Sequence, residues 1–345
     1  MYPKEPQGNI ARNFHTLCLL ITGIIQSKSS QLPKISEKAP HLIKLDSLTK
    51  RFERWTRNAN VNAKLFFLPF IMRLLTVLYL PMAYIAIDGS VVGRNCVTLM
   101  ASLIYQKRAI PLVWITQRGK KGHLKEKIHL ALLKQVKAIL PTGMDVVILG
   151  DGEFDGINFL EKIHSYGWDY VIRTAKNAKV MLPGEGLTSF SDYVPMRGKA
   201  IFLKDIAFTK AGYEVESAIV WWRKDCAAPL YLISNVDNAI EVLSHYKRRF
   251  LVETFFSDKK SRGFHLHKSH LEKIKRLNAL MIATCLAYIW IIYLGVYCKT
   301  HGLQAVVHRK SRCDLSLFQL GFRLLNYLLK ESLPMLWKIS KKWEE

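Results

Sequence analysis

Four residues in the last third of the chain have types and a spacing that suit phosphate chemistry. They are Tyr246, Arg249, Glu253 and Lys260, in the pattern Tyr-x2-Arg-x3-Glu-x6-Lys. Offsets of three, four and seven lie on neighbouring faces of a helix, so the pattern predicts one helix through this segment. One carboxylate flanked by a phenol, a guanidinium and an ammonium is unusual on a solvated face. This combination of side chains suits the binding of a phosphodiester beside a bound metal ion.

Two aspartates stand at equivalent places in the sequence, each after an apolar run and before a glycine. Asp88 lies in IAIDGS and Asp151 in VILGDGEFD. Carboxylates at the carboxyl ends of adjacent strands face a common crevice, although for either aspartate alone an ordinary Asp-Gly turn is the more frequent explanation. With Glu253 they form a set of three that can hold two divalent cations about 4 Å apart for in-line phosphoryl transfer. Glu153 and Asp155 rank below Asp151, because successive residues after a strand do not all point into one site.

The segments around these aspartates predict an α/β fold with a mixed sheet. Apolar or β-branched runs predict three strands in a meander, an amphipathic pattern predicts a helix, and a further run predicts a strand parallel to the first. Asp151 and Glu253 are 102 positions apart (253 − 151), which is more than one helix and one strand require. Three further strand patterns fill this interval and predict a β-rich insertion. The predicted strands are 84–87, 96–105, 110–116, 145–149, 170–174, 200–208, 215–222 and 230–234, and the helix is 123–140.

Charge points to a polyanionic partner. The chain has 345 residues, with 51 Lys and Arg against 27 Asp and Glu, for a formal net charge of +24. The basic residues are spread along the whole chain, which favours nucleic acid as the partner over an inert basic surface. The segment 47–58 carries Arg51 and Arg54 around two aromatic residues, and it is either a basic recognition helix or an ordinary amphipathic surface helix.

Cysteine usage and the apolar segments bear on location. The six cysteines form no Cys-x-x-Cys pair, and the first residues show no secretory cleavage pattern, so we expect a cytoplasmic protein with reduced thiols.

The run 277–298 has no charged residue and is long enough to span a bilayer. Asn278 and Thr284 interrupt the run, and both of its flanks are basic, so a helix buried in the core is the favoured interpretation.

With its two strand-end aspartates and its downstream Tyr-Arg-Glu-Lys signature, the chain resembles the DDE transposases of bacterial insertion sequences. The resemblance covers about residues 80 to 300 and implies an RNase H-like catalytic core: a mixed sheet flanked by helices, with a β-rich insertion and a helical N-terminal DNA-binding region. It divides the chain into an end-binding region (1–80), the first part of the core (81–175), the insertion (176–240), the signature-bearing core helices (241–300) and a helical tail (301–345).

The resemblance also implies roles for individual residues. Asp88, Asp151 and Glu253 would be the catalytic residues and would hold two Mg²⁺ ions, with Mn²⁺ as a substitute. Tyr246, Arg249 and Lys260 would hold the DNA end, although a tyrosine buried against the helix is the alternative for Tyr246. Trp221 or Trp222, of which Trp222 is the preferred candidate, would stack on a flipped-out base, although a tryptophan that covers the core is an equally good explanation. The synaptic complex would be a homodimer on DNA.

The resulting hypothesis is a transposase that binds inverted-repeat ends, cleaves DNA and transfers the 3′ hydroxyl strand to target DNA. A catalytically inactive DNA-binding derivative is the first alternative, and a membrane-anchored protein is the second.

Gly152 departs from the family pattern, because relatives often carry a basic residue after the second aspartate. His265, His267 and His270 form a further cluster, for which a basic loop is favoured over a zinc site, since no cysteine or acidic partner has suitable spacing.

Overall fold

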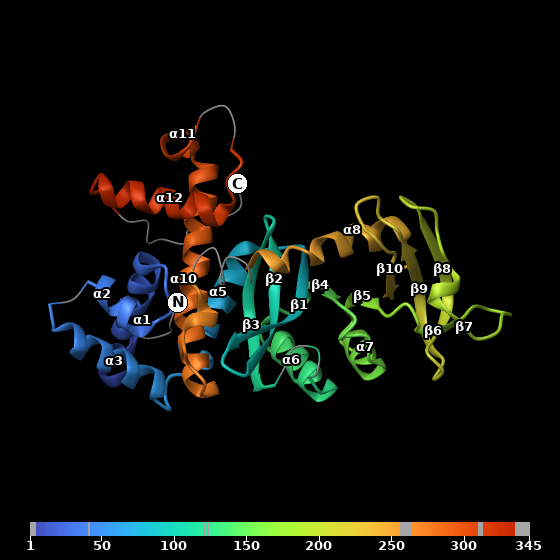
Figure 1. Cartoon of the computed structure of the whole chain (residues 1–345), viewed down its shortest axis with the longest axis horizontal. Coiled ribbons are helices and arrows are strands. Elements are labelled where there is room, and N and C mark those ends of the chain that lie inside the picture. The colour runs from blue at the N-terminus through green and yellow to red at the C-terminus, as the bar shows by residue number, and fades with distance from the viewer. Residues whose placement is uncertain are drawn as a thin grey trace.

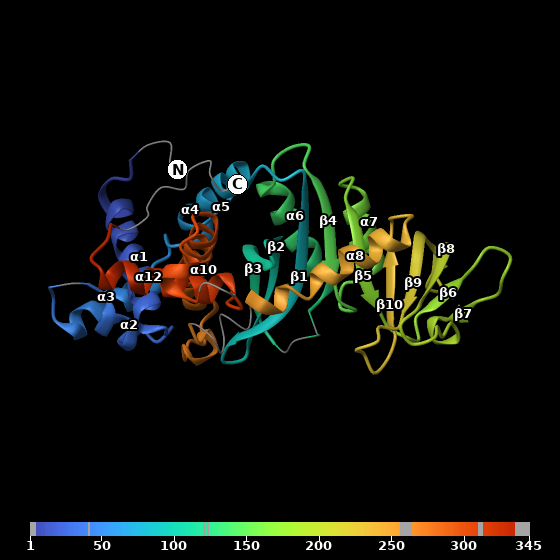
Figure 2. The same ribbon diagram turned by 90° about the horizontal axis from the view of Figure 1, so that it is seen from above.

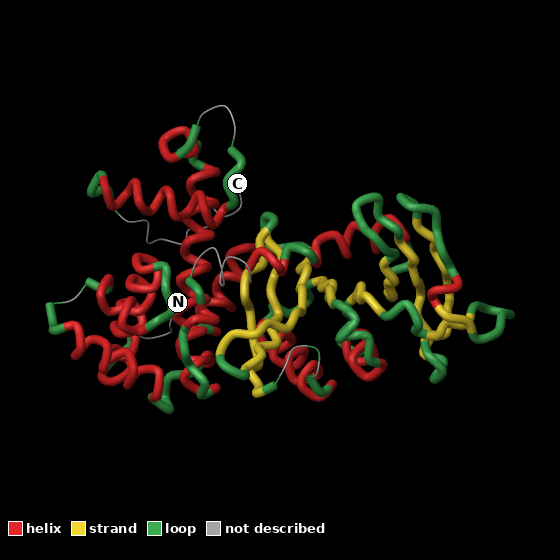
Figure 3. Tube along the Cα trace, in the orientation of Figure 1, coloured by secondary structure: helices red, strands yellow, loops and turns green. Residues whose placement is uncertain are grey.

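The chain folds into three regions that follow one another along its long axis. The computed structural model describes residues 5–40, 42–119, 122, 124–255, 264–309 and 313–334. Helices from both ends of the chain gather at one end, a sheet with helices on both faces lies in the middle, and a β-rich extension of that sheet forms the other end (Figure 1). Figure 3 shows the same division between the helical and the strand-rich parts.

The helical elements account for most of the N-terminal and C-terminal regions. Residues 252–255 form one further helical turn. The helices are α1 (Gly8–Ser27), α2 (Leu32–Lys38), α3 (Leu45–Arg57), α4 (Ala63–Phe66), α5 (Leu68–Leu78), α6 (Glu126–Ile139), α7 (Ile157–His164), α8 (Ala239–Arg249), α10 (Ile274–Thr300), α11 (Gln304–Val307) and α12 (Leu317–Lys330), with 3-10 turns η1 (Phe190–Asp192) and η2 (Leu266–Lys268).

The strands form one mixed sheet in the order β3-β2-β1-β4-β5-β10-β9-β8-β6-β7. β1 pairs with β4 and β4 with β5 in parallel, and the other pairs are antiparallel. The insertion therefore extends the central sheet past β5. The strands are β1 (Met82–Gly93), β2 (Cys96–Tyr105), β3 (Arg108–Arg118), β4 (Asp145–Gly150), β5 (Asp169–Thr174), β6 (Lys179–Met181), β7 (Thr188–Ser189), β8 (Ala200–Phe208), β9 (Tyr213–Trp221) and β10 (Leu230–Ser234).

Helices cover both faces of the central strands. α6 packs against β2 and β3 and α7 against β5, while α8 crosses β1, β4 and β5. Figure 2 shows α6 and α7 on one side of the sheet and α8 on the other. The mixed sheet flanked by helices, with a β-rich extension and an N-terminal helical region, confirms the predicted fold class.

α8 is the element that brings the signature residues to the sheet. Its N-terminus is capped by the Asn238 side chain, which accepts hydrogen bonds from the backbone N–H groups of Ile240 and Glu241. The basic residues of its last turn stabilise the helix, because they lie at the negative end of the helix dipole. The helix ends at Arg249, and Glu253 lies on the separate turn 252–255, where its N–H donates to the Phe250 carbonyl three residues back. The prediction of one continuous helix through the signature was therefore wrong, because this tighter hydrogen bonding interrupts it.

α10 is the long apolar helix that the sequence singled out. Among the described helices it is the one long and apolar enough to cross a membrane, and 89% of its most apolar window is buried inside the chain. It crosses α12 at Gly295 and Gly321, where a Cβ on either glycine would run into the backbone carbonyl of Leu317 or Ile291 on the other helix. This burial favours the core-helix interpretation over a membrane anchor.

Candidate active site

The sheet register aligns the two aspartates. β1 runs parallel to β4 with Ala86 opposite Leu149, so two residues further along Asp88 comes level with Asp151. Asp151 directly follows β4, as predicted, whereas Asp88 lies inside β1, which continues to Gly93 as the first arm of a hairpin with β2. Asp88 is therefore buried within the sheet, and Asp151 is half-buried at a strand end.

Arg249 makes contact with all three predicted carboxylates. Its Nη2 donates a hydrogen bond of 3.0 Å to Asp151 Oδ2 and lies 4.0 Å from Asp88 Oδ1. Its Nη1 lies 3.8 Å from Glu253 Oε1. The guanidinium is 9% exposed, so these contacts form in a largely desolvated position, where charge interactions are stronger than in water.

The other signature residues occupy different environments. The Glu253 side chain is 65% exposed, in contrast to the 6% of Asp88. Tyr246 is 1% exposed and packs edge-on against Phe250, and its burial raises the pKa of the phenol to about 12. This position favours the buried-tyrosine alternative over direct contact with DNA. Lys260 lies outside the described residues.

The loop after Asp151 is held by two neighbouring side chains. Glu153 points toward His129 of α6, with 3.6 Å between its Oε1 and the imidazole Nε2, and its backbone N–H donates to Asp151 Oδ1 at 3.2 Å. Asp155 accepts a 2.6 Å hydrogen bond from Thr174, and burial raises the pKa of its carboxyl group. Both carboxylates thus have structural contacts outside the set around Arg249, in agreement with their lower ranking.

Gly150 and Gly152 flank Asp151 and differ in the space around them. A Cβ on Gly150 would lie 2.8 Å from Cδ1 of Ile172 on β5, so a larger residue there requires this side-chain end to shift. A Cβ on Gly152 would meet no atom closer than 3.7 Å, so this position has space for the first carbon of a side chain.

Aromatic rings and cations gather where β9 meets α8. Arg223 lies over the rings of Trp221 and Phe250, at 5.4 and 5.3 Å, and Lys247 lies 5.6 Å from the Trp221 ring. Trp222 instead donates its indole N–H to the Cys226 carbonyl within its own loop. This geometry favours Trp221 over the predicted Trp222 as a base-stacking residue, because Trp221 is half-buried beside two cations that can bind the phosphates of a stacked nucleotide.

The predicted recognition helix corresponds to α3. Arg51 donates through Nε to Thr16 of α1 at 3.0 Å, which ties α3 to its neighbour. Arg54 is exposed to solvent. The two arginines therefore differ, since Arg54 is open to a DNA backbone whereas Arg51 has a packing role as well.

The histidine cluster lies on a loop that docks on the N-terminal helices. Ser30 donates to the His265 carbonyl at 3.0 Å, and Gln31 donates to the Lys268 carbonyl at 3.1 Å. Gln31 also lies 3.2 Å from the His270 ring nitrogen. In the described part of the chain, no group of three or more His, Cys, Asp or Glu side chains is close enough together to hold a metal ion.

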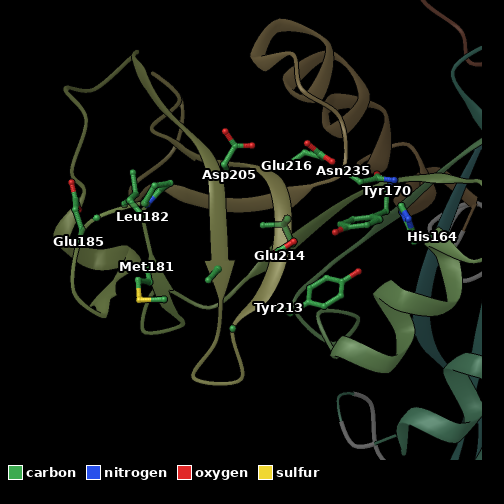
Figure 4. A pocket seen from close by; sticks show the side chains of 15 residues that line it. His164, Tyr170, Met181, Leu182, Glu185, Asp205, Tyr213, Glu214, Glu216 and Asn235 are labelled. Atoms are coloured by element: carbon green, nitrogen blue, oxygen red, sulfur yellow. The ribbon is translucent and has the colours of Figure 1, made fainter.

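A cavity among the described residues lies where the insertion meets α7 and β5, away from the three carboxylates. It has a volume of about 860 Å³ and is lined by acidic side chains, including Asp205, Glu214 and Glu216, around the hydrogen-bonded phenols of Tyr170 and Tyr213 (Figure 4). Carboxylates repel phosphate, so this cavity does not suit a nucleic-acid backbone.

Comparison with known proteins assigns the chain to a family. The family model described as Transposase DDE domain matches residues 101–290, more than half of the chain, and the chain belongs to this family. Asp151 and Glu253 lie inside the matched range, and Asp88 precedes it. No curated protein matches the sequence.

Solved structures show more distant likenesses. The chain is similar to a piggyBac transposase in a synaptic complex with hairpin DNA, with a TM-score of 0.49, 14% identity, and coverage of 99% of this chain and 77% of that one. It is also similar to Marinitoga piezophila Argonaute (TM-score 0.26, 18% identity, 48% and 25% covered) and to the catalytic domain of human endonuclease V (TM-score 0.26, 12% identity, 60% and 93% covered).

Three features of the site were not predicted from the sequence. They are the contact of Arg249 with the carboxylates, the His129–Glu153 pair and the position of Trp221 between two cations. The amphipathic pattern of α6 places His129 on its buried face, but that pattern does not identify Glu153 as its partner. Arg249 was singled out for phosphate binding, and its spacing from Glu253 was the one available signal for a carboxylate contact.

Proposed function

We propose that this DDE transposase binds the inverted-repeat ends of a mobile element, cleaves the DNA there and transfers the 3′ hydroxyl strand to target DNA. The observation that carries the proposal is the contact of Asp88 and Asp151, which are aligned on neighbouring strands, and of Glu253, on the turn after α8, with a single cationic group. The family match independently supports a transposase. The specific chemistry and the roles of the residues are the proposed part.

The donor set fits a hard divalent cation. Three carboxylates supply oxygen ligands of the type that Mg²⁺ and Mn²⁺ prefer, and the position among them already attracts positive charge. When bound there, divalent cations would activate an attacking oxygen and stabilise a leaving oxygen. We assign Asp88, Asp151 and Glu253 to hold them.

The protein groups around these carboxylates would position the DNA. Arg249 and Lys260 would bind phosphates of the DNA end, and a guanidinium suits this task because its planar donors match phosphate oxygens. Trp221, with Arg223 and Lys247, is suited to stack on an unpaired base beside the cleavage point. Arg54, and to a lesser degree Arg51, would contact the DNA backbone at the N-terminal helices. We further propose a cytoplasmic homodimer as the DNA-bound form.

An excision assay tests the proposal directly. A plasmid carrying the coding region with its native flanking DNA is incubated with purified protein and Mg²⁺, and the released ends are sequenced. Asp151→Asn and Glu253→Gln should reduce excision to background while gel-shift binding of the ends is retained. Excision by either variant at the unaltered rate would contradict the assignment.

Matched controls come from the same two elements. Asp145→Asn changes an exposed aspartate at the opposite end of β4, and Glu241→Gln changes a carboxylate in the first turn of α8. Both variants should excise normally. End binding without excision by the unaltered protein would favour the catalytically inactive derivative instead.

A further inference from the structure

Arg249 lies among the three carboxylates that we assign to metal binding. Its two terminal nitrogens lie between 3.0 and 4.0 Å from oxygens of Asp88, Asp151 and Glu253. Its Nε is buried and has no hydrogen-bond partner within the described part of the chain. The contacts of this guanidinium are thus made almost entirely by the two terminal nitrogens, toward the three acids.

The charges in this cluster require a cation. Three carboxylates around one group repel one another, and the burial of Asp88 and the partial burial of Asp151 make that repulsion more costly than it would be in water. Arg249 supplies one positive charge at the point where their oxygens converge. The three acids contact this guanidinium but are not gathered closely enough to hold a metal ion in the described structure. Arg249 therefore offsets one of the three negative charges and lies between the acids that it contacts.

A divalent cation and this guanidinium cannot use the same oxygens at once. A Mg²⁺ ligand distance is about 2.1 Å, so an ion bound to Asp151 Oδ2 would lie next to Arg249 Nη2, which is 3.0 Å from that oxygen. Two cations at such separation repel strongly in a desolvated site. The hydrogen bond from Arg249 to Asp151 has to break when the ion binds.

The local backbone is suited to such a change. Arg249 is the last residue of α8, and the chain continues through a turn before the segment that carries Glu253. The Glu253 carboxylate is 65% exposed, so it can approach Asp88 and Asp151 without leaving a buried contact. A guanidinium released from the carboxylates remains beside them, where the phosphate of a DNA end would lie.

We propose that Arg249 is an internal counter-cation of the metal-free site, and that divalent metal binding displaces it and so makes its guanidinium available to a DNA phosphate. This inference rests on the proposed function, because it assumes that the three carboxylates bind metal. It adds a competition between Arg249 and the ion. Because of this competition, the affinity for metal in the absence of DNA is lower than it would be for the same three carboxylates without Arg249.

Mn²⁺ binding to the full chain without DNA tests the competition. The free Mn²⁺ signal in electron paramagnetic resonance gives the dissociation constant for the unaltered protein and for Arg249→Gln. In the variant, Mn²⁺ binding no longer has to break the charge-assisted hydrogen bond of Arg249, so its dissociation constant should fall about ten- to a hundredfold. Arg248→Gln is the matched control, since it removes the same charge one residue earlier, where the guanidinium stacks on Tyr84 at 4.0 Å. It should bind Mn²⁺ as the unaltered protein does.

The outcomes separate this inference from the proposed function. Equal or weaker Mn²⁺ binding by Arg249→Gln, with binding that Asp151→Asn abolishes, would overturn the displacement and leave the metal site standing. No Mn²⁺ binding by any variant would overturn the metal site and the displacement together. Circular dichroism establishes that each variant is folded. Should Arg249→Gln fail to fold, Arg249→Lys replaces it, and the loss of the planar donors should still tighten Mn²⁺ binding several-fold.

Discussion

Replacement of Gly321 by alanine tests the crossing of α10 and α12, which supports the helical end of the molecule. A Cβ at this position would overlap the Ile291 carbonyl of α10, and the obstructing atoms belong to a backbone that cannot turn aside like a side chain. Overpacking a core costs about 1–3 kcal/mol, and a backbone obstruction belongs at the upper end, near 3 kcal/mol. At about 2 °C per kcal/mol for a chain of this size, the midpoint of thermal unfolding should fall by about 6 °C.

Differential scanning calorimetry of the purified chain is the appropriate assay. Gly186→Ala is the control, because no atom lies within 4 Å of the Cβ it would gain. Gly295→Ala should destabilise the chain as Gly321→Ala does, and the double variant should lose less than the sum, since both changes separate the same two helices. A Gly321→Ala midpoint within about 1 °C of the unaltered protein would refute the close approach of these helices.

Three further predictions concern other contacts. Asn278→Ala should cost about 2 kcal/mol in urea unfolding, because the Trp114 and Thr116 side chains would lose their shared acceptor. Burial lowers the pKa of His245 in the folded chain below the unfolded value near 6.5. The contribution of this residue to stability is therefore present above the unfolded pKa and is lost as pH falls through the folded pKa. His245→Gln should flatten the decline of the thermal midpoint between about pH 7 and 5. Trp221→Ala should weaken binding of a single-stranded DNA end about tenfold in fluorescence anisotropy, whereas an unchanged affinity would argue against stacking on this ring.

The order of strands and helices in the core could be predicted from local patterns. Alternating or continuous apolar runs identified β2, β8 and β10 closely, because burial on one or both faces of a sheet fixes the residue types along a strand. The alignment of Asp88 with Asp151 followed from the expectation of two neighbouring parallel strands. That expectation needed no knowledge of side-chain contacts, since register alone brings the two positions together.

The contacts inside the site could not be predicted in the same way. Arg249 and Asp151 are separated by 98 residues, and their hydrogen bond depends on how α8 crosses the sheet. The spacing of Arg249 and Glu253 is that of a continuous helix, and it gave no sign of the interruption after Arg249. The choice between Trp221 and Trp222 likewise depended on where β9 ends, and strand ends are poorly fixed by composition.

The exposure of the three acids follows from the elements that carry them. Asp88 lies inside a strand with neighbours on both sides and is 6% exposed. Asp151 follows a strand end and is 23% exposed. Glu253 lies on a short turn after α8 and is 65% exposed. The sheet therefore fixes two carboxylates by backbone register, whereas the third is positioned by a helix end and by its contact with Arg249. Because the same arginine also contacts both aspartates, its guanidinium links the turn that carries Glu253 to the two carboxylates of the sheet, in addition to the packing of α8 on β1, β4 and β5.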